Sequence, residues 1–184
     1  DDEVTYRRNT EAYECCDLVP NVLAGVEEVD LSTTVMGIPI DLPLFLSPTA
    51  LQRLFHHEGE RAVGRAAEAF NTLFGISSLA TVGIEEIAET IRTPKIFQLY
   101  YHKDKALTWS MIDRCLDAGF DALALTVDTI VGGNRERDLW TGFTSPPKLT
   151  PSSLLSFATH PSWTLNYLLR DPFQLSNLKD HVAE

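Results

Sequence analysis

The stretch Lys95-Ile-Phe-Gln-Leu-Tyr100 is a short apolar run that one amide interrupts and a phenol ends. Three other runs share this character, and helix-like stretches separate all four. They read Leu42-Pro-Leu-Phe-Leu-Ser-Pro-Thr49, Thr72-Leu-Phe-Gly-Ile-Ser-Ser78 and Asp121-Ala-Leu-Ala-Leu-Thr-Val-Asp128. Alternation of strands and helices predicts parallel strands joined by helical crossovers, so the expected fold class is α/β.

The stretches between the runs have helical periodicity. Apolar residues recur at three and four positions over residues 58–70, 83–91 and 105–120. The strand–helix units follow one another at the spacing of a TIM (β/α)8 barrel, which takes roughly 250 residues when complete. A chain of 184 residues with four such units therefore supplies about the first half of a barrel.

The expected organisation is a single partial domain over residues 1–184. Residues 1–41 are predicted to form an N-terminal helix and a hairpin. Residues 42–148 contain the first four strand–helix units, and residues 149–184 form an insertion or loop segment.

Composition excludes several classes of function. A net charge of -11 argues against a nucleic-acid surface, which needs clustered Lys and Arg. Three cysteines without metal-ligand spacing predict reduced thiols, and the acidic start has the wrong charge for a signal peptide. We therefore expect a cytoplasmic protein.

The stretch from Leu149 to Leu169 carries no Asp, Glu, Lys or Arg. Its prolines and serines argue against a transmembrane helix. One interpretation is a lid or a segment that packs against another subunit. The other is a peripheral membrane contact over residues 149–170, made by Trp163, Tyr167 and neighbouring leucines.

Neutral polar residues stand at the ends of the four predicted strands. They are Thr49, Ser77, Gln98 and Thr126. The carboxyl ends of parallel strands form the ligand face of such folds, so we expect these side chains to converge. Groups that both donate and accept suit a large, neutral, planar heterocycle such as a flavin, although other cofactors also fit. Alternatively, these groups satisfy backbone ends or each other.

Two further residues are candidates for binding a substrate. Tyr100 lies two residues after Gln98 and therefore on the same side of the strand, where its phenol could bind a hydroxyl or a carboxylate. Arg135 lies in a loop after the fourth run, and a guanidinium there suits bidentate capture of a carboxylate. A surface pair with Glu136 or Asp138 is the simpler interpretation of Arg135.

An ordered set of motifs resembles the FMN-dependent α-hydroxy acid dehydrogenase and oxidase family, and in particular its L-lactate and mandelate dehydrogenase branch. The motifs are Asp1-Asp-Glu-Val-Thr5, Arg8-Asn9, Ser47-Pro-Thr-Ala50, His56 with Glu58-Gly-Glu60, Ser77-Ser78 with Ala80-Thr81, Phe97-Gln-Leu-Tyr100, Leu125-Thr-Val-Asp-Thr129, Arg135-Glu136, Phe143-Thr144 and Pro146-Pro147.

The resemblance implies roles for the candidate residues. Pro48, Thr49 and Ala50 would lie against the ring of FMN, and Ser77, Gln98 and Thr126 would hydrogen-bond it. Tyr100 would serve as the catalytic contact to the substrate, and Arg135 would help to bind the substrate carboxylate. The implied reaction is oxidation of an L-2-hydroxy acid, with lactate or mandelate as the first candidates, to the 2-oxo acid by hydride transfer to the flavin.

The resemblance also sets expectations for the complete protein. It implies a homotetramer that acts on a small 2-hydroxy acid, in the cytoplasm or bound peripherally to the inner face of the cell membrane. The family's catalytic base is a His in a His-Gly-x-Arg-like motif, and none of the five histidines stands in one. We therefore expect that motif, and the phosphate-binding glycine-rich strands, outside this chain.

Two other functions stay open on the sequence alone. One is a phosphate-binding barrel, such as an aldolase or an isomerase, although no strand end carries the Lys or Glu that it would use. The other is a non-catalytic half barrel that acts only as an assembly partner.

Overall fold

The structure, a computed structural model, describes residues 2–144, 150–172 and 174–178. The described residues divide into two compact units, and each is described by itself. Residues up to 29 together with 131–154 form the first unit, and residues 30–130 together with the later ones form the second. Asp1, Pro146-Pro147 and Leu149, which the sequence analysis used, lie outside the described residues.

The first unit contains short helical segments. The predicted N-terminal helix is present as α1 (Val4–Glu11), which η1 (Ala12–Cys15) extends. The loop that carries Arg135 leads into α6 (Glu136–Thr141), and Arg137 forms an ion pair with Glu3 at 3.1 Å.

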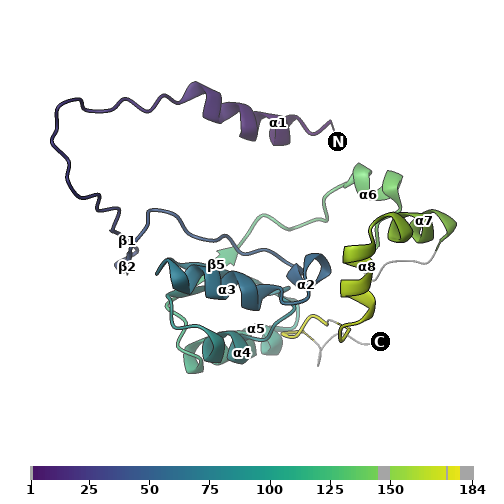
Figure 1. Ribbon diagram of the computed structural model, residues 1–184. Helices are drawn as coiled ribbons and strands as arrows, with labels where there is room; N and C mark the ends of the chain where they lie inside the picture. Colours follow the sequence, from purple (N-terminus) through teal and green to yellow (C-terminus); the bar gives the residue numbers. More distant parts are fainter. Residues whose placement is uncertain (1, 145–149, 173, 179–184) are drawn as a thin grey trace. The chain divides into compact units, whose positions relative to one another are not determined.

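The second unit contains the sheet and the helices that the sequence predicts (Figure 1). Its strands are β3 (Phe74–Ser77), β4 (Lys95–Tyr100) and β5 (Ala122–Thr126), parallel and adjacent in that order. The crossovers are α4 (Ile84–Thr90) and α5 (Lys105–Asp117). Before β3 come α2 (Gln52–Phe55) and α3 (Glu60–Ala69), and α8 (Pro161–Leu168) lies in the later segment. The helix α7 (Pro151–Thr159) begins in the first unit and ends in the second.

The first predicted strand is reduced to one bridge. Leu46 pairs in parallel with Phe74, and its N–H donates to the Leu73 carbonyl at 3.0 Å. Pro43 and Pro48 flank this contact, and neither has the N–H that a longer ladder would need. The order of strands is nevertheless that expected for the start of a barrel.

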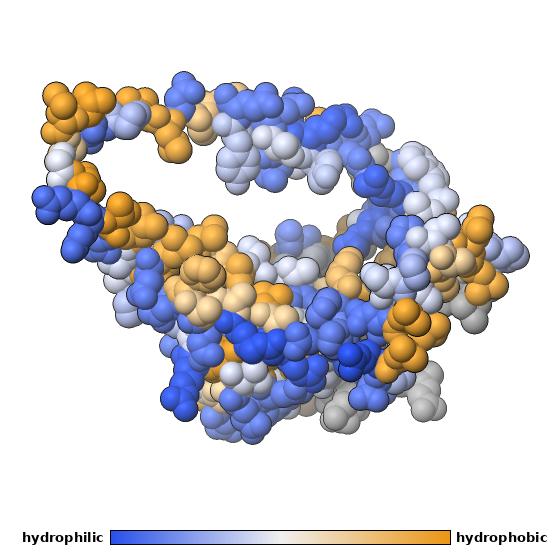
Figure 2. All heavy atoms as spheres, viewed as in Figure 1, coloured by the Kyte–Doolittle hydropathy of each residue, from blue (hydrophilic) through white to orange (hydrophobic). Residues whose placement is uncertain are grey.

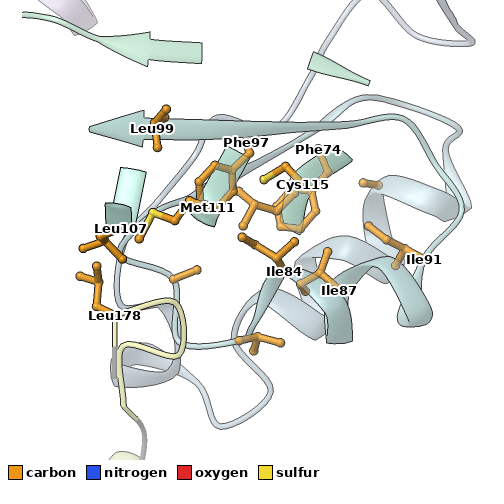
Figure 3. Close-up of a cluster of buried hydrophobic side chains, with 14 residues drawn as sticks. Phe74, Ile84, Ile87, Ile91, Phe97, Leu99, Leu107, Met111, Cys115 and Leu178 are labelled. Atoms are coloured by element: carbon orange, nitrogen blue, oxygen red, sulfur yellow. The ribbon is translucent and has the colours of Figure 1, made fainter. Parts of the chain in front are cut away.

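The two faces of the sheet are covered differently. On one face, Phe74, Phe97 and Leu99 pack against α3, α4 and α5 in the main core, which Figure 3 shows as side chains that point toward one another. Cys115 of α5 lies in this core, and burial raises the pKa of its thiol to about 12. The thiol is therefore neutral at physiological pH.

A hairpin covers the opposite face at the amino ends of the strands. It consists of β1 (Thr33–Val35) and β2 (Ile38–Ile40), joined by the predicted Met36-Gly37 turn. Both turn residues have positive φ, which Gly37 adopts without a steric penalty. Ile40 packs with Leu73 and Ile96 in a second, smaller core. The hairpin therefore leaves the carboxyl ends of the strands, where the polar residues stand, uncovered.

The last strand of the described sheet is poorly covered. Leu123 and Leu125 of β5 are 43% and 57% exposed, whereas Phe97 and Leu99, their neighbours in register on β4, are buried. Among the described residues no strand pairs with the other edge of β5. Both observations agree with a barrel of which about half is present.

Candidate active site

Three of the predicted polar residues meet at the carboxyl ends of three adjacent strands. The hydroxyl of Ser77, at the end of β3, donates to Gln98 Oε1 of β4 at 3.2 Å. Gln98 Nε2 donates in turn to Thr126 Oγ1, at the end of β5, at 2.7 Å. The structure thus brings Ser77, Gln98 and Thr126 into one hydrogen-bonded row, although the first and the last are 49 positions apart in the sequence.

Alternation along the strand explains why Gln98 faces this row. Phe97 and Leu99 point into the main core, so Gln98 and Tyr100 point to the opposite face of the sheet. That face carries the hairpin at its amino end and the polar row at its carboxyl end.

The orientation of the Gln98 carboxamide is fixed by a residue that the sequence analysis did not assign to the site. Ser78 is fully buried, and its backbone N–H and its hydroxyl donate to Gln98 Oε1 at 3.3 and 3.4 Å. With Ser77, three donors surround this oxygen, so the NH2 group is directed toward β5. The only feature of the sequence that could have indicated this role of Ser78 is its position directly after a buried strand.

The segment Pro48–Ala50 lies beside the end of β3. The N–H of Gly75 donates to the Leu46 carbonyl at 2.7 Å, and the N–H of Leu51 donates to the Leu79 carbonyl at 3.2 Å. A side chain at Gly75 would meet Pro48 Cδ at 2.7 Å, so only glycine permits this approach. Thr49 is exposed, and its hydroxyl donates to the Ser47 carbonyl at 3.4 Å rather than to the polar row.

The two candidate substrate residues lie in different units. Tyr100 is half-buried at the end of β4, in register with Thr126, and so beside the polar row. Arg135 is exposed and precedes α6 in the first unit, so its predicted role rests on the sequence alone. Within the described ranges, no group of His, Cys, Asp and Glu could hold a metal ion.

Comparison with protein families identifies the chain. The model of the family described as FMN-dependent dehydrogenase matches residues 1–184. The chain belongs to this family. The predicted family and its cofactor, FMN, are thereby confirmed.

Similar proteins are known by sequence and by structure. Glycolate oxidase 1 of Zea mays is 42% identical over 150 residues, which cover 82% of this chain and 41% of the maize protein. L-lactate oxidase of a Nostoc species is 41% identical over 161 residues, 85% of this chain and 44% of that protein. The crystal structure of the monotopic membrane protein (S)-mandelate dehydrogenase superposes with a TM-score of 0.89 at 30% identity, over 97% of this chain and 48% of that chain.

These comparisons confirm the predicted fold class. The chain spans less than half the length of each of these relatives, and the structural similarity is to FMN-dependent barrel enzymes. A partial TIM barrel is therefore the architecture of this chain.

The residues present fit the flavin of FMN. Thr126 accepts one hydrogen of Gln98 Nε2, and no other described residue accepts the second. Gln52 Oε1, three residues after Thr49, is buried and accepts no hydrogen bond in the part of the chain that the structure describes. A neutral ring with both donors and acceptors at its edge suits such groups.

Proposed function

We propose that the complete protein oxidises an L-2-hydroxy acid to the 2-oxo acid with FMN as its cofactor. The observation that carries the proposal is the row Ser77–Gln98–Thr126 at the carboxyl ends of three parallel strands, in a chain of an FMN-dependent family. Family membership favours this reaction over an aldolase or isomerase barrel.

Each candidate residue has a part in the proposed reaction. FMN, when bound, would supply the hydride acceptor for this oxidation. Ser77, Gln98 and Thr126 would hold the edge of its ring, and the backbone of Pro48–Ala50 would contact the ring. The phenol of Tyr100 binds the substrate, and Arg135 pairs with its carboxylate. The hydroxyl proton goes to a base in the His-Gly-x-Arg-like motif, which we expect outside this chain.

The substrate we propose is lactate or mandelate. The similar proteins act on glycolate, lactate and mandelate according to their names, so the common feature is a carboxylate next to a hydroxyl-bearing carbon. We also propose that the complete protein is a homotetramer. Within this chain we propose one partial domain, in which residues 149–184 are an insertion.

A spectroscopic experiment tests the proposed function. The full-length protein is purified, its visible spectrum is recorded, and L-lactate, (S)-mandelate or glycolate is added without oxygen. We expect a flavin spectrum that bleaches with an L-2-hydroxy acid and not with D-lactate, because hydride transfer reduces the ring. A colourless full-length protein would favour the aldolase or isomerase barrel. A flavin that no hydroxy acid bleaches would exclude the proposed reaction.

We further propose that α8 binds a membrane surface peripherally. Its two sides differ, since Trp163 stacks on Tyr167 with ring centroids 5.1 Å apart, and the Trp163 indole donates to the Leu54 carbonyl at 2.8 Å. Both members of this pair, which the sequence predicts as membrane contacts, are half-buried. Leu165, Leu168 and Leu169 share the other side by their spacing and are 55%, 69% and 75% exposed.

The surroundings of these leucines support the proposal. Figure 2 shows apolar surface over the segment that holds α7 and α8. Phe157 of α7 also contacts Trp163, at 5.3 Å between ring centroids, so the two helices pack on each other through their aromatic residues. None of the described helices has both the length and the apolar character needed to cross a bilayer. The similar (S)-mandelate dehydrogenase is named a monotopic membrane protein.

Vesicle binding tests the membrane contact. In the full-length protein, replacing Leu165, Leu168 and Leu169 together by Gln should lower partition into phosphatidylcholine–phosphatidylglycerol vesicles at least about tenfold, because three apolar side chains no longer enter the interface. Cosedimentation measures the partition. Leu116→Gln, on the exposed side of α5, serves as the control and should not change it. Equal binding of the triple variant and the unaltered protein would contradict the proposal.

A further inference from the structure

Glu60, the first residue of α3, is a carboxylate with no exposed surface. Its Oε1 accepts the backbone N–H of Thr81 at 2.9 Å, and its Oε2 accepts the Thr81 hydroxyl at 2.6 Å. Among the described residues no cation forms a salt bridge with Glu60. A buried anion is costly unless it is hydrogen-bonded, and here both oxygens depend on one residue.

Thr81 joins two loops that come from different strands. Its Oγ1 also accepts the backbone N–H of Arg53 at 3.2 Å, which ties the start of α2, and with it the loop after Leu46, to the loop after β3. Two residues earlier, the N–H of Leu51 donates to the Leu79 carbonyl at 3.2 Å and connects the same two loops again. Glu60 therefore anchors, through Thr81, the point at which these loops meet.

The two loops carry the residues expected to bind the flavin. Pro48–Ala50 belongs to the first loop. Ser77 ends β3 and Ser78 begins the second loop, and both donate to Gln98 Oε1. Ser78 lies three residues before Thr81 in the same loop. A displacement of Thr81 would therefore also move Ser78 and release the carboxamide of Gln98.

We propose that Glu60 is a positioning residue for FMN: through Thr81 it holds the two loops at the spacing that the flavin ring requires. The inference rests on the proposed function, because it assigns a role only if FMN binds at this end of the strands. It adds to that function a residue that does not touch the cofactor.

The experiment uses the full-length protein and the change Glu60→Gln, which replaces one of the two oxygens that accept hydrogen bonds from Thr81 by an NH2 group. We expect the Kd for FMN to rise about tenfold or more, since charged hydrogen bonds contribute about that factor. We also expect the visible circular dichroism of the bound flavin to change and kcat to fall. Glu58→Gln is the matched control. The Arg65 side chain, 2.6 Å away, lowers the pKa of this exposed carboxyl. The loss of the Glu58 charge should leave FMN binding unchanged.

A second pair of variants keeps the test valid if Glu60→Gln fails to fold. Thr81→Val removes the hydroxyl with little change in volume and should weaken FMN binding in the same way, whereas Thr81→Ser should restore it. A lower unfolding midpoint with unchanged Kd and flavin dichroism, in either Glu60→Gln or Thr81→Val, would assign Glu60 a structural role only and overturn the inference. An unaltered protein without flavin would refute the proposed function itself, which is a different result.

Discussion

Replacing Gln98 by Leu should raise the Kd of the full-length protein for FMN about 100-fold, so that the protein is purified largely without flavin. The substitution removes the amide expected to hydrogen-bond the ring, and it leaves the hydroxyls of Ser77 and Ser78 without the oxygen that they share. Each lost hydrogen bond to a buried group costs about 1–3 kcal/mol, and two such losses give a factor of this size. Titration of the apoprotein with FMN, followed by flavin fluorescence, measures the effect.

The control for this prediction is the same substitution at an exposed position. Gln174→Leu should bind FMN as the unaltered protein does, because Gln174 is exposed and distant in sequence from the strand ends. If Gln98→Leu is folded by circular dichroism and binds FMN with unchanged Kd, the polar row does not form the flavin site.

Gly75→Ala should destabilise the full-length protein by about 3 kcal/mol and weaken FMN binding at the same time. The new Cβ would lie 2.7 Å from Pro48 Cδ, 2.8 Å from Pro48 N and 2.9 Å from the Leu46 carbonyl oxygen. Two of these atoms belong to the backbone, so the clash is relieved only if the segment before Thr49 moves away from β3. The Gly75–Leu46 hydrogen bond of 2.7 Å would be lost in that movement.

Urea unfolding of the apoprotein measures the loss of stability. Gly133→Ala is the matched control, since nothing lies within 4 Å of a Cβ built there, and it should change the free energy of unfolding by less than about 0.5 kcal/mol. A loss below about 1 kcal/mol for Gly75→Ala would show that the Leu46–Pro48 segment does not approach β3 as closely as described.

The sequence predicted the elements of the sheet well because their signals are local. Apolar runs and helical spacing gave β3, β4, β5, α4 and α5 at close to their observed bounds. The one overestimate, the strand at Leu42–Thr49, arose because two prolines prevent the ladder that its apolar residues suggest.

The sequence predicted most of the residues of the candidate site, but not the hydrogen bonds between them. Parallel strands place their carboxyl ends at one edge, which is why Ser77, Gln98 and Thr126 could be expected together. Thr49 was expected in the same row, and the structure turns its hydroxyl to Ser47 instead. Which atom of Gln98 faces β3 depends on Ser78, and nothing in the apolar pattern of either strand indicates that contact.

The amino-acid order alone thus determined the α/β class, the barrel type and the polar residues at the strand ends, since these follow from the periodicity of each element and from the order and spacing of the elements along the chain. Only the tertiary structure decided that Glu60 is buried against Thr81 and that the indole of Trp163 turns inward to Leu54. These partners are 21 and 109 residues apart. A contact over such a separation depends on how whole elements pack, and the hydropathy of neighbouring residues carries no record of it.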